Sequence, residues 1–258
     1  MILQAGFNIL VPLCGKSSFF DTAEYPFPKP LVEINGQPMI QWVVDNLNTV
    51  RNGKKFIFII KTIENEQFYI ENTLKLLTNQ GCDIIKISHD TLGAPCTCLM
   101  AIDQINNDIP LVISNSDQII DADLSKIVDH FLDRDVDAGV VCFNSVHPKW
   151  SYVRLDEQEN IIETAEKRPL SRFAIAGFYF FKHGKDFVRA AFRSIKKGTQ
   201  INGVYYIAPA LNELILENKR LGVFKIASSQ YHSFYSPQKI EEFEKILREQ
   251  RRTSVVSL

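Results

Sequence analysis

The segment Leu13–Leu31, "LCGKSSFFDTAEYPFPKPL", holds the side chains best suited to phosphate chemistry. It follows an apolar run and contains Gly15 next to Lys16, as in glycine-containing loops whose backbone N–H groups cradle phosphates. Lys29 lies between two prolines, and because these restrict the backbone, its ammonium group is presented from a stiff segment. The segment therefore predicts a phosphate site.

The charge composition limits the partners of such a site. The 29 Lys and Arg residues nearly balance the 30 Asp and Glu residues, which leaves no general basic field for a nucleic-acid backbone or an anionic membrane surface. We therefore expect no nucleic-acid or membrane partner, and any phosphate must be bound locally. The apolar start, residues 1–13, lacks a basic region and a cleavage site and is far shorter than the ~20 residues that span a bilayer, so it predicts a strand.

The five cysteines are an odd number and lie mostly in apolar runs, which indicates a reducing, cytoplasmic environment. Cys96 and Cys98 have a spacing that supplies half of some metal sites. No second Cys/His pair lies nearby, and the pattern around them is helical, so we expect buried small residues rather than ligands.

Apolar runs and amphipathic segments alternate in the first half of the chain. This pattern is typical of a mostly parallel sheet covered by helices on both faces, with ligands bound at the carboxyl ends of its strands. The loop after the first strand and "SNSDQ" at 114–118 should meet at that edge. Strands are expected at 7–13, 55–61, 82–88 and 110–114, and helices at 38–50, 66–77 and 94–105.

The second half predicts added strands at 138–144, 150–156, 160–167, 172–182 and 222–227, with helices at 184–197 and 208–218. A terminal helix should run over 236–252, with Ser236 as its N-cap and Pro237 as its first residue. No repeat or Pro/Ser-rich linker separates the halves. We therefore predict one domain, residues 1–258, with halves 1–136 and 137–258.

The motifs in this order resemble those of the sugar-phosphate nucleotidylyltransferases, most closely those of bacterial surface-polysaccharide loci. The loop is similar to their P-M-A-G-x-G-S-R-F, "FPKPL" to their F-P-K-P-L, and "NGQPMI" to their N-G-K-P-M-I. "SNSDQ", "AEKRP", "AGFYFF" and "NGVYYIAPALNELI" continue the likeness over about 200 residues. The resemblance implies a three-layer, Rossmann-like α/β fold of the GT-A type, with a nucleotide half and an acceptor half that carries the added strands.

The resemblance also implies an enzyme activity. In this family a phosphate or phosphonate oxygen attacks the α-phosphorus of a nucleoside triphosphate and releases pyrophosphate, with Mg²⁺ as cofactor. The implied partners are CTP, UTP or dTTP and a phosphorylated small molecule, and the product would supply surface (capsular) polysaccharide in the cytoplasm. Assembly into a homo-oligomer is an open alternative.

Roles follow for the matching positions, and no one base is favoured. Lys29 and Lys16 would be catalytic, Asp117 would ligate Mg²⁺, and "HDTLGAPCT" would lie over the base and ribose. Glu166 would accept hydrogen bonds from acceptor hydroxyl or amino groups, and Lys167 would meet its phosphate. The implied nucleotide-binding residues are Leu13, Gly15, Lys16, Thr91, Gly93 and Asn115, and the acceptor-binding residues are Glu166, Lys167, Gly177 and Asn202.

This sequence departs from the family pattern at reactive positions. Ser17 replaces the second loop glycine, Phe19 replaces an arginine, and Val204 replaces a frequent glutamate. A second metal-binding aspartate of the wider family is expected near this last segment, where Ala208 and Pro209 stand, although closer relatives often have proline there too. Transition-state arginines contribute about 10³ to 10⁵ in phosphoryl-transfer rate, so the loss at position 19 matters. We expect Lys16 to supply a charge instead.

Two other functions therefore stay open. One is a binding or regulatory module that keeps the pocket without catalysis. The other is a glycosyltransferase, in which "DAD" at Asp121–Asp123 would bind a metal. Asp123 is better explained as the N-cap of a helix over 124–134.

Overall fold

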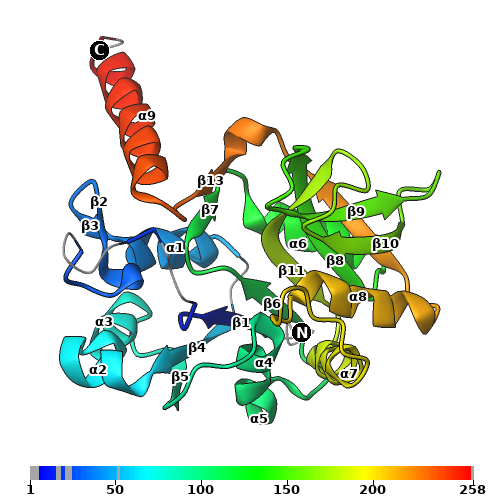
Figure 1. Ribbon diagram of the computed structural model, residues 1–258. Coiled ribbons are helices and arrows are strands. Elements are labelled where there is room, and N and C mark those ends of the chain that lie inside the picture. Colours follow the sequence, from blue (N-terminus) through cyan, green and yellow to red (C-terminus); the bar gives the residue numbers. More distant parts are fainter. Residues whose placement is uncertain (1–5, 16–18, 21–24, 51–52, 257–258) are drawn as a thin grey trace, which may run out of the picture.

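The computed structural model describes residues 6–15, 19–20, 25–50 and 53–256. Within them, nine strands form one mixed sheet (Figure 1). These strands are β1 (Phe7–Pro12), β4 (Lys54–Lys61), β5 (Cys82–Ile87), β6 (Leu111–Ser114), β8 (Ala138–Asn144), β9 (Ser151–Leu155), β10 (Ile161–Glu166), β11 (Phe173–Phe181) and β12 (Leu221–Lys225).

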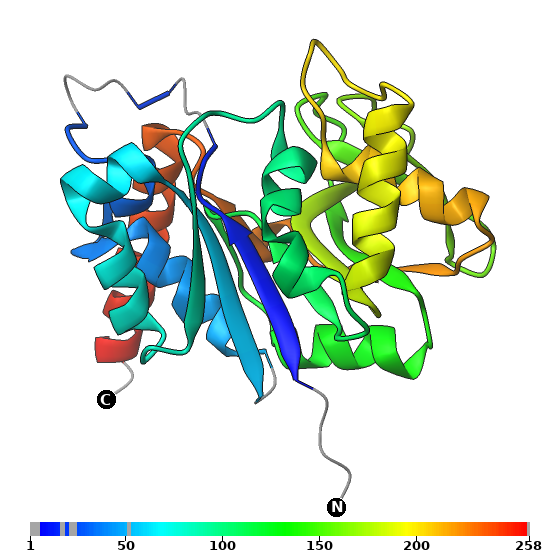
Figure 2. The ribbon, with the colours of Figure 1, turned by 90° about the horizontal axis from the view of Figure 1, so that it is seen from below.

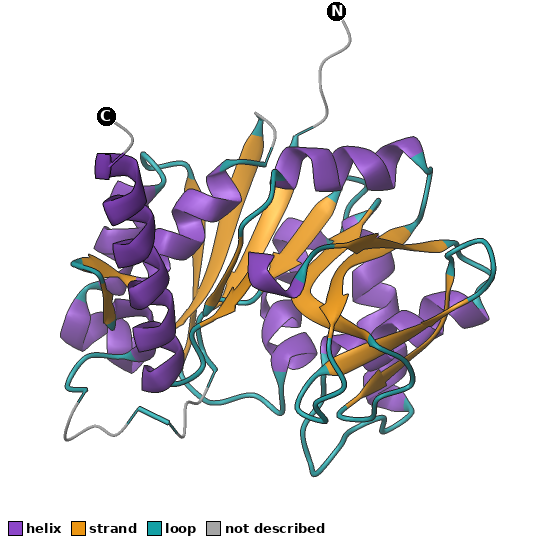
Figure 3. Cartoon of the chain, turned by 90° about the horizontal axis from the view of Figure 1, so that it is seen from above, coloured by secondary structure: helices purple, strands orange, loops and turns teal. Residues whose placement is uncertain are grey.

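The strand order is β10-β9-β11-β6-β1-β4-β5, with β8 beside β11 and β12 beside β8. Strands β6, β1, β4 and β5 are parallel, as predicted. Strand β11 joins this set antiparallel to β6, with Phe178 opposite Ser114, so the added strands continue the same sheet (Figure 3). The carboxyl end of β6 therefore lies beside the middle of β11.

Helices cover both faces of the sheet, which confirms the predicted three-layer α/β fold (Figure 2). Alternation within the strands divides the two cores: Ile9 and Val11 point to one, and Leu10 points to the other. The helices are α1 (Met39–Asn48), α2 (Thr62–Phe68), α3 (Ile70–Leu77), α4 (Ala94–Cys98), α5 (Ile102–Ile105), α6 (Leu124–Asp133), α7 (Gly184–Lys196), α8 (Ile207–Leu216) and α9 (Pro237–Val256). Of these, α1, α3 and α6 pack on the first face, and α4, α5, α7 and α8 pack on the second.

Short elements complete the chain. They are the 3₁₀ turns η1 (Lys29–Leu31), η2 (Leu99–Ala101) and η3 (Ser228–Gln230) and the strands β2 (Glu33–Ile34), β3 (Gln37–Pro38), β7 (Gln118–Ile120) and β13 (Tyr231–Ser233). None of the helices in the described part of the chain has the length and apolar character needed to cross a membrane.

Two predicted helices are interrupted. The helix expected at 66–77 is split at Tyr69, which has a φ of +54°, and the Asn65 side chain accepts a hydrogen bond from Glu71 N–H at the start of α3. The helix expected at 94–105 is three short pieces, α4, η2 and α5. Of its cysteines, Cys98 is fully buried as expected, whereas Cys96 is only half-buried.

Two predicted helix starts are confirmed. The Asp123 side chain accepts hydrogen bonds from Ser125 N and Lys126 N at 3.0 and 3.3 Å, so it caps α6. Helix α9 begins at Pro237, and Ser236 O accepts its first backbone hydrogen bonds.

The C-terminal segment returns to the first half of the chain. Strand β13 pairs with β7, and α9 packs its Ile240 and Phe243 against Ile34 and Met39. Glu244 also accepts a hydrogen bond from Asn35 N–H in the turn between β2 and β3. This return brings residues 231–234 beside β7 and the loop that follows β6.

Candidate active site

Lys29 and Asp117 meet at the carboxyl edge of the central strands. The η1 turn holds Lys29 through backbone hydrogen bonds from Leu31 N to Pro28 O and from Val32 N to Lys29 O. Lys29 Nζ lies 2.5 Å from Asp117 Oδ2, and the two side chains are 19% and 24% exposed. The two groups predicted to act on phosphate and metal are therefore in direct contact, although 88 residues separate them.

Strands β6 and β7 and the strands beside them position Asp117. It follows β6, whose continuation at Asn115 N donates to Gly177 O of β11. It precedes β7, which pairs with β13, and Phe234 N donates to Asp117 O at 2.7 Å. The C-terminal segment thus fixes the backbone on which the carboxylate stands.

The donor set at Asp117 suits a metal that arrives with a phosphate ligand. No cluster of three or more His, Cys, Asp or Glu side chains able to hold a metal occurs within the described residues. Mg²⁺ is commonly bound by one or two carboxylates together with water and substrate phosphate oxygens, and a single partly exposed carboxylate fits that mode. Asp117 therefore fits shared coordination and not a dedicated protein cage.

The resemblance implies that the family's second metal-binding aspartate falls near Ala208 and Pro209, which lie in α8. The late segment that adjoins Asp117 is instead β13, in which Ser233 pairs with Gln118. The apolar-polar alternation of "YHSFYSP" before the start of α9 is a signal that could have indicated a strand there.

A cavity of about 280 Å³, here called the Glu166 pocket, joins the two halves of the chain. It brings together Asn115, Glu166 and Gly177 of the predicted set. Asn115, predicted to bind nucleotide, thus lies on the same wall as the predicted acceptor residues. The lining is Ala94, Asn115, Lys149, Trp150, Ser151, Glu166, Ile175, Gly177, Tyr179, Tyr206, Ile207 and Tyr231.

Glu166 is 7% exposed and accepts a hydrogen bond from Ser151 Oγ. Burial raises the pKa of Glu166, while this hydrogen bond and the charge of Lys167 oppose the increase. Lys167 donates to Tyr206 Oη at 2.7 Å, and this hydrogen bond raises the lysine's pKa. Lys167 thus stands, protonated, next to a wall residue of the pocket.

Gly177 leaves space for Asn115, which also lines the Glu166 pocket. It has a φ of +62° where β11 is irregular, and an added Cβ would lie 2.2 Å from Asn115 Nδ2 and 2.4 Å from Gln118 Oε1. Asn115 Nδ2 donates to Gln118 Oε1, and Gln118 Nε2 donates to Ala176 O. The missing side chain therefore leaves room for this amide pair.

Replacing Gly177 by alanine is expected to disturb stability and the pocket together. Gly198 is the matched control, because it has a φ of +67° and an added Cβ meets nothing within 4 Å. Gly198→Ala should lose about 1–2 kcal/mol of unfolding free energy from backbone strain alone, and Gly177→Ala about 1–3 kcal/mol more from overpacking. Urea unfolding and the acceptor KM measure the two effects. Equal unfolding free energies and equal KM values would contradict this account of Gly177.

The loop after β1, which is predicted to bind the nucleotide, is described at residues 13–15 and 19–20. Leu13 is buried and donates its N–H to Ile59 O. Gly15 is exposed, and an added Cβ there would meet nothing within 4 Å, so packing within the protein does not require glycine at this position. Lys16 and Ser17 lie outside the described residues. Phe19 is 59% exposed and meets the ring of Tyr235 edge-on at 5.6 Å.

Thr91 and Gly93 lie in a loop that pairs with the segment before α8. Gly93 has a φ of +134° and bridges to Tyr205, whose carbonyl oxygen would lie 2.1 Å from an added Cβ. The Thr91 hydroxyl lies 2.6 Å from that of Thr97. The loop predicted to cover the base is therefore braced by the segment before α8.

Asn202 stands apart from the other predicted residues. It is exposed in a tight turn with Gly203, closed by hydrogen bonds between Ile201 and Val204, and it lines neither of the two cavities described here. Its assigned role stays a prediction.

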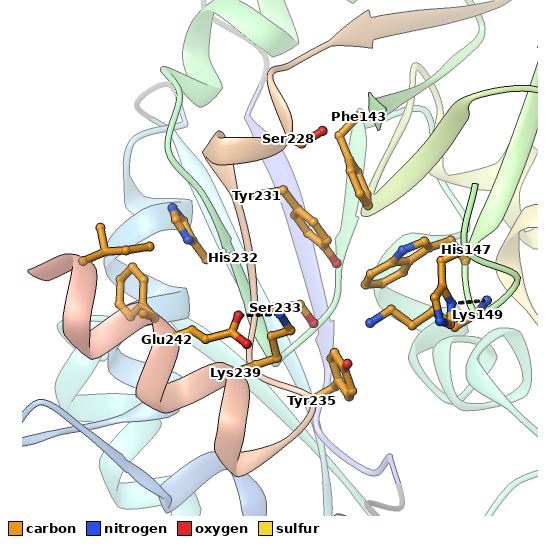
Figure 4. Close-up of a pocket in the computed structure, with 13 residues that line it drawn as sticks. Phe143, His147, Lys149, Ser228, Tyr231, His232, Ser233, Tyr235, Lys239 and Glu242 are labelled. Atoms are coloured by element: carbon orange, nitrogen blue, oxygen red, sulfur yellow. Dashed lines mark hydrogen bonds and ion pairs between the residues drawn. The ribbon is translucent and has the colours of Figure 1, made fainter. Parts of the chain in front are cut away.

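A second cavity of about 280 Å³, here called the Tyr235 pocket, adjoins the first and was missed by sequence reasoning (Figure 4). The two cavities share Lys149, Trp150 and Tyr231. Aromatic and basic residues clustered in "VHPKWSY" and "YHSFYSP" were the available signal. The lining is Phe143, His147, Lys149, Trp150, Ser228, Tyr231, His232, Ser233, Tyr235, Lys239, Glu242, Phe243 and Ile246.

Comparisons with known proteins identify a matching family and similar folds. The model of the family described as "Nucleotidyl transferase" matches residues 25–205. The nucleoside-diphosphate-sugar pyrophosphorylase from Vibrio cholerae RC9 has a similar structure, with a TM-score of 0.79 and 21% identity over 92% of this chain and 99% of that one.

Two further structures are similar. A putative glucose-1-phosphate thymidylyltransferase from Bacillus anthracis, in complex with a sucrose, has a TM-score of 0.75 and 18% identity over 94% of this chain and 96% of that one. A UDP-glucose pyrophosphorylase complexed with UDP-glucose has a TM-score of 0.74 and 17% identity over 95% and 99%. No curated protein sequence matches this chain. At these identities the structural likeness establishes a common fold.

Proposed function

Because the chain belongs to the nucleotidyl transferase family, we propose that it transfers a nucleoside monophosphate from a nucleoside triphosphate to a phosphorylated small molecule and releases pyrophosphate. The observation that carries the proposal is the contact between Lys29 and Asp117 at 2.5 Å, at the same sheet edge as the Glu166 pocket. A cation and a carboxylate at that point suit a reaction between two phosphates, which requires positioning and charge neutralisation.

The proposed reaction forms one bond and breaks one. An oxygen of the acceptor phosphate attacks the α-phosphorus, and the bond from that phosphorus to the oxygen bridging to the β-phosphorus breaks. Lys29 would contact the α-phosphate, and Lys167 would hold the acceptor phosphate. Asp117 would help to hold Mg²⁺, which would supply neutralisation of part of the phosphate charge.

The acceptor is proposed to be a sugar phosphate or a similar molecule. Glu166, buried beside Ser151, would accept hydrogen bonds from its hydroxyl or amino groups. Names of similar structures support this class, because they refer to glucose 1-phosphate and UDP-glucose. CTP, UTP and dTTP are the proposed donors, and the product would supply surface polysaccharide from the cytoplasm.

The proposal is tested by measuring pyrophosphate release with each of CTP, UTP and dTTP against a panel of sugar 1-phosphates and other small phosphate esters. Release should require the triphosphate, one acceptor and Mg²⁺ together, because each supplies part of the charged centre. Nucleotide binding without release for any pair would favour a regulatory module. Transfer of a sugar from a nucleotide sugar would favour a glycosyltransferase. The case for that function is weaker because Asp123, which would help to bind its metal, caps α6.

A further inference from the structure

Lys149 presents a positive charge where the two cavities meet. It lies between β8 and β9, in the acceptor half, and lines both the Glu166 pocket and the Tyr235 pocket. Its Nζ is 3.8 Å from the centroid of the Tyr235 ring and 4.4 Å from that of Trp150 (Figure 4). In the described part of the chain, no carboxylate forms an ion pair with it, so aromatic faces hold the ammonium and leave its charge uncompensated.

The charges around the Tyr235 pocket favour an anion. Lys239 pairs with Glu242, the one acidic residue of the lining. Burial lowers the pKa of His232, which keeps this imidazole neutral near pH 7. Of the two lysines that line this cavity, Lys239 is therefore paired with a carboxylate, and Lys149 has no such partner among the described residues. The rest of the lining is mostly aromatic and polar.

Tyr235 connects Lys149 to the nucleotide loop. Phe19 packs edge-on against one part of the Tyr235 ring, while the ammonium of Lys149 lies over its face. Tyr235 directly follows Phe234, whose N–H binds Asp117 O. Phe19, which stands where an arginine was expected, thus meets the same ring as Lys149. That ring belongs to the residue after Phe234, and Phe234 N–H is the donor that holds the backbone of Asp117.

We propose that Lys149 is a further catalytic residue, which contacts the phosphate groups of the two substrates where they meet. From the acceptor half it would supply the positive charge that Phe19, in place of an arginine, does not. Lys149 would donate hydrogen bonds to phosphate oxygens as the pyrophosphate leaves. This inference rests on the proposed function of the same site.

The first test compares pyrophosphate release by Lys149→Met, which keeps the stem without the charge, with that by Lys149→Arg. Loss of a charged hydrogen bond should lower kcat/KM by about tenfold to a hundredfold in Lys149→Met, and Lys149→Arg should stay within about threefold of the wild type. Lys182→Met is the control, because Lys182 pairs with Asp135 and follows β11 beside the start of β6, opposite the edge that carries Asp117. Equal melting temperatures would exclude misfolding.

A second test places the charge at position 19, which also meets the Tyr235 ring. Phe19→Arg in the Lys149→Met background should recover at least about fivefold of the lost kcat/KM, because either cation would meet the same ring and phosphates. Wild-type kcat/KM in Lys149→Met would overturn the inference and leave the proposed function standing. If the wild type releases no pyrophosphate, calorimetry with inorganic pyrophosphate and Mg²⁺ still decides: weaker binding by Lys149→Met supports the anion site, and equal binding overturns it.

Discussion

Lys29→Met is expected to lower kcat/KM for pyrophosphate release by roughly 10³, the largest effect of any single change proposed for this chain. The methionine keeps an apolar stem of similar length but cannot neutralise the α-phosphate as charge moves to the leaving pyrophosphate. The η1 turn and the flanking prolines restrict the backbone of Lys29, so the wild-type ammonium group is presented from a stiff segment.

The loss should be catalytic and not structural. Lys29 and Asp117 are both partly exposed, and such an ion pair contributes about 1 kcal/mol or less to stability. Lys55→Met is the matched control, because Lys55 pairs with Asp83 near the start of β4, at the opposite edge of the sheet. A kcat/KM of Lys29→Met within tenfold of the wild-type value would show that Lys29 does not contact the reacting phosphate.

Asp117→Asn is expected to remove most of the Mg²⁺ dependence of nucleotide binding and to lower kcat by roughly 10² to 10³. The amide keeps the shape of the side chain but loses the negative charge that a hard cation requires. Because the described residues contain no cluster of three or more side chains able to hold a metal, the metal should bind tightly only with the triphosphate present. Calorimetric titrations with nucleotide alone, with Mg²⁺ alone and with both together measure how much each ligand strengthens the binding of the other.

Asp121→Asn is the control for Asp117→Asn. Asp121 is exposed four residues later, and its backbone is held by hydrogen bonds with Gln230. It should keep wild-type activity, whereas a metal role for the "DAD" segment would make it as damaging as Asp117→Asn. Tight Mg²⁺ binding without nucleotide, or undiminished linkage in Asp117→Asn, would refute the assignment of Asp117.

Local patterns predicted the sheet better than they predicted the helices. In β4, Phe56, Phe58 and Ile60 face one core, while Ile57 and Ile59 face the other, so a continuous apolar run correctly indicated a strand buried on both faces. Residues 66–77 also have a helical pattern, but Tyr69 takes a left-handed conformation that the pattern does not encode.

The individual site residues were visible in the sequence because their chemistry depends on local features. Lys29 is stiffened by its neighbouring prolines, Asp117 ends a buried strand, and both assignments needed only the residues around them. Topology also predicted that the ends of β1 and β6 share an edge, since parallel strands place their carboxyl ends together.

The sequence by itself determined the α/β order, the parallel centre of the sheet and the candidates for phosphate chemistry, because apolar periodicity and strand ends are short-range properties. Only the tertiary structure decided which candidates touch. The Lys29–Asp117 contact joins residues 88 positions apart, and the Tyr235 pocket combines 143–150 with 228–246 through the return of β13 and α9. Such contacts depend on how distant segments pack, and no local spacing specifies that Lys149 should meet the same ring as Phe19.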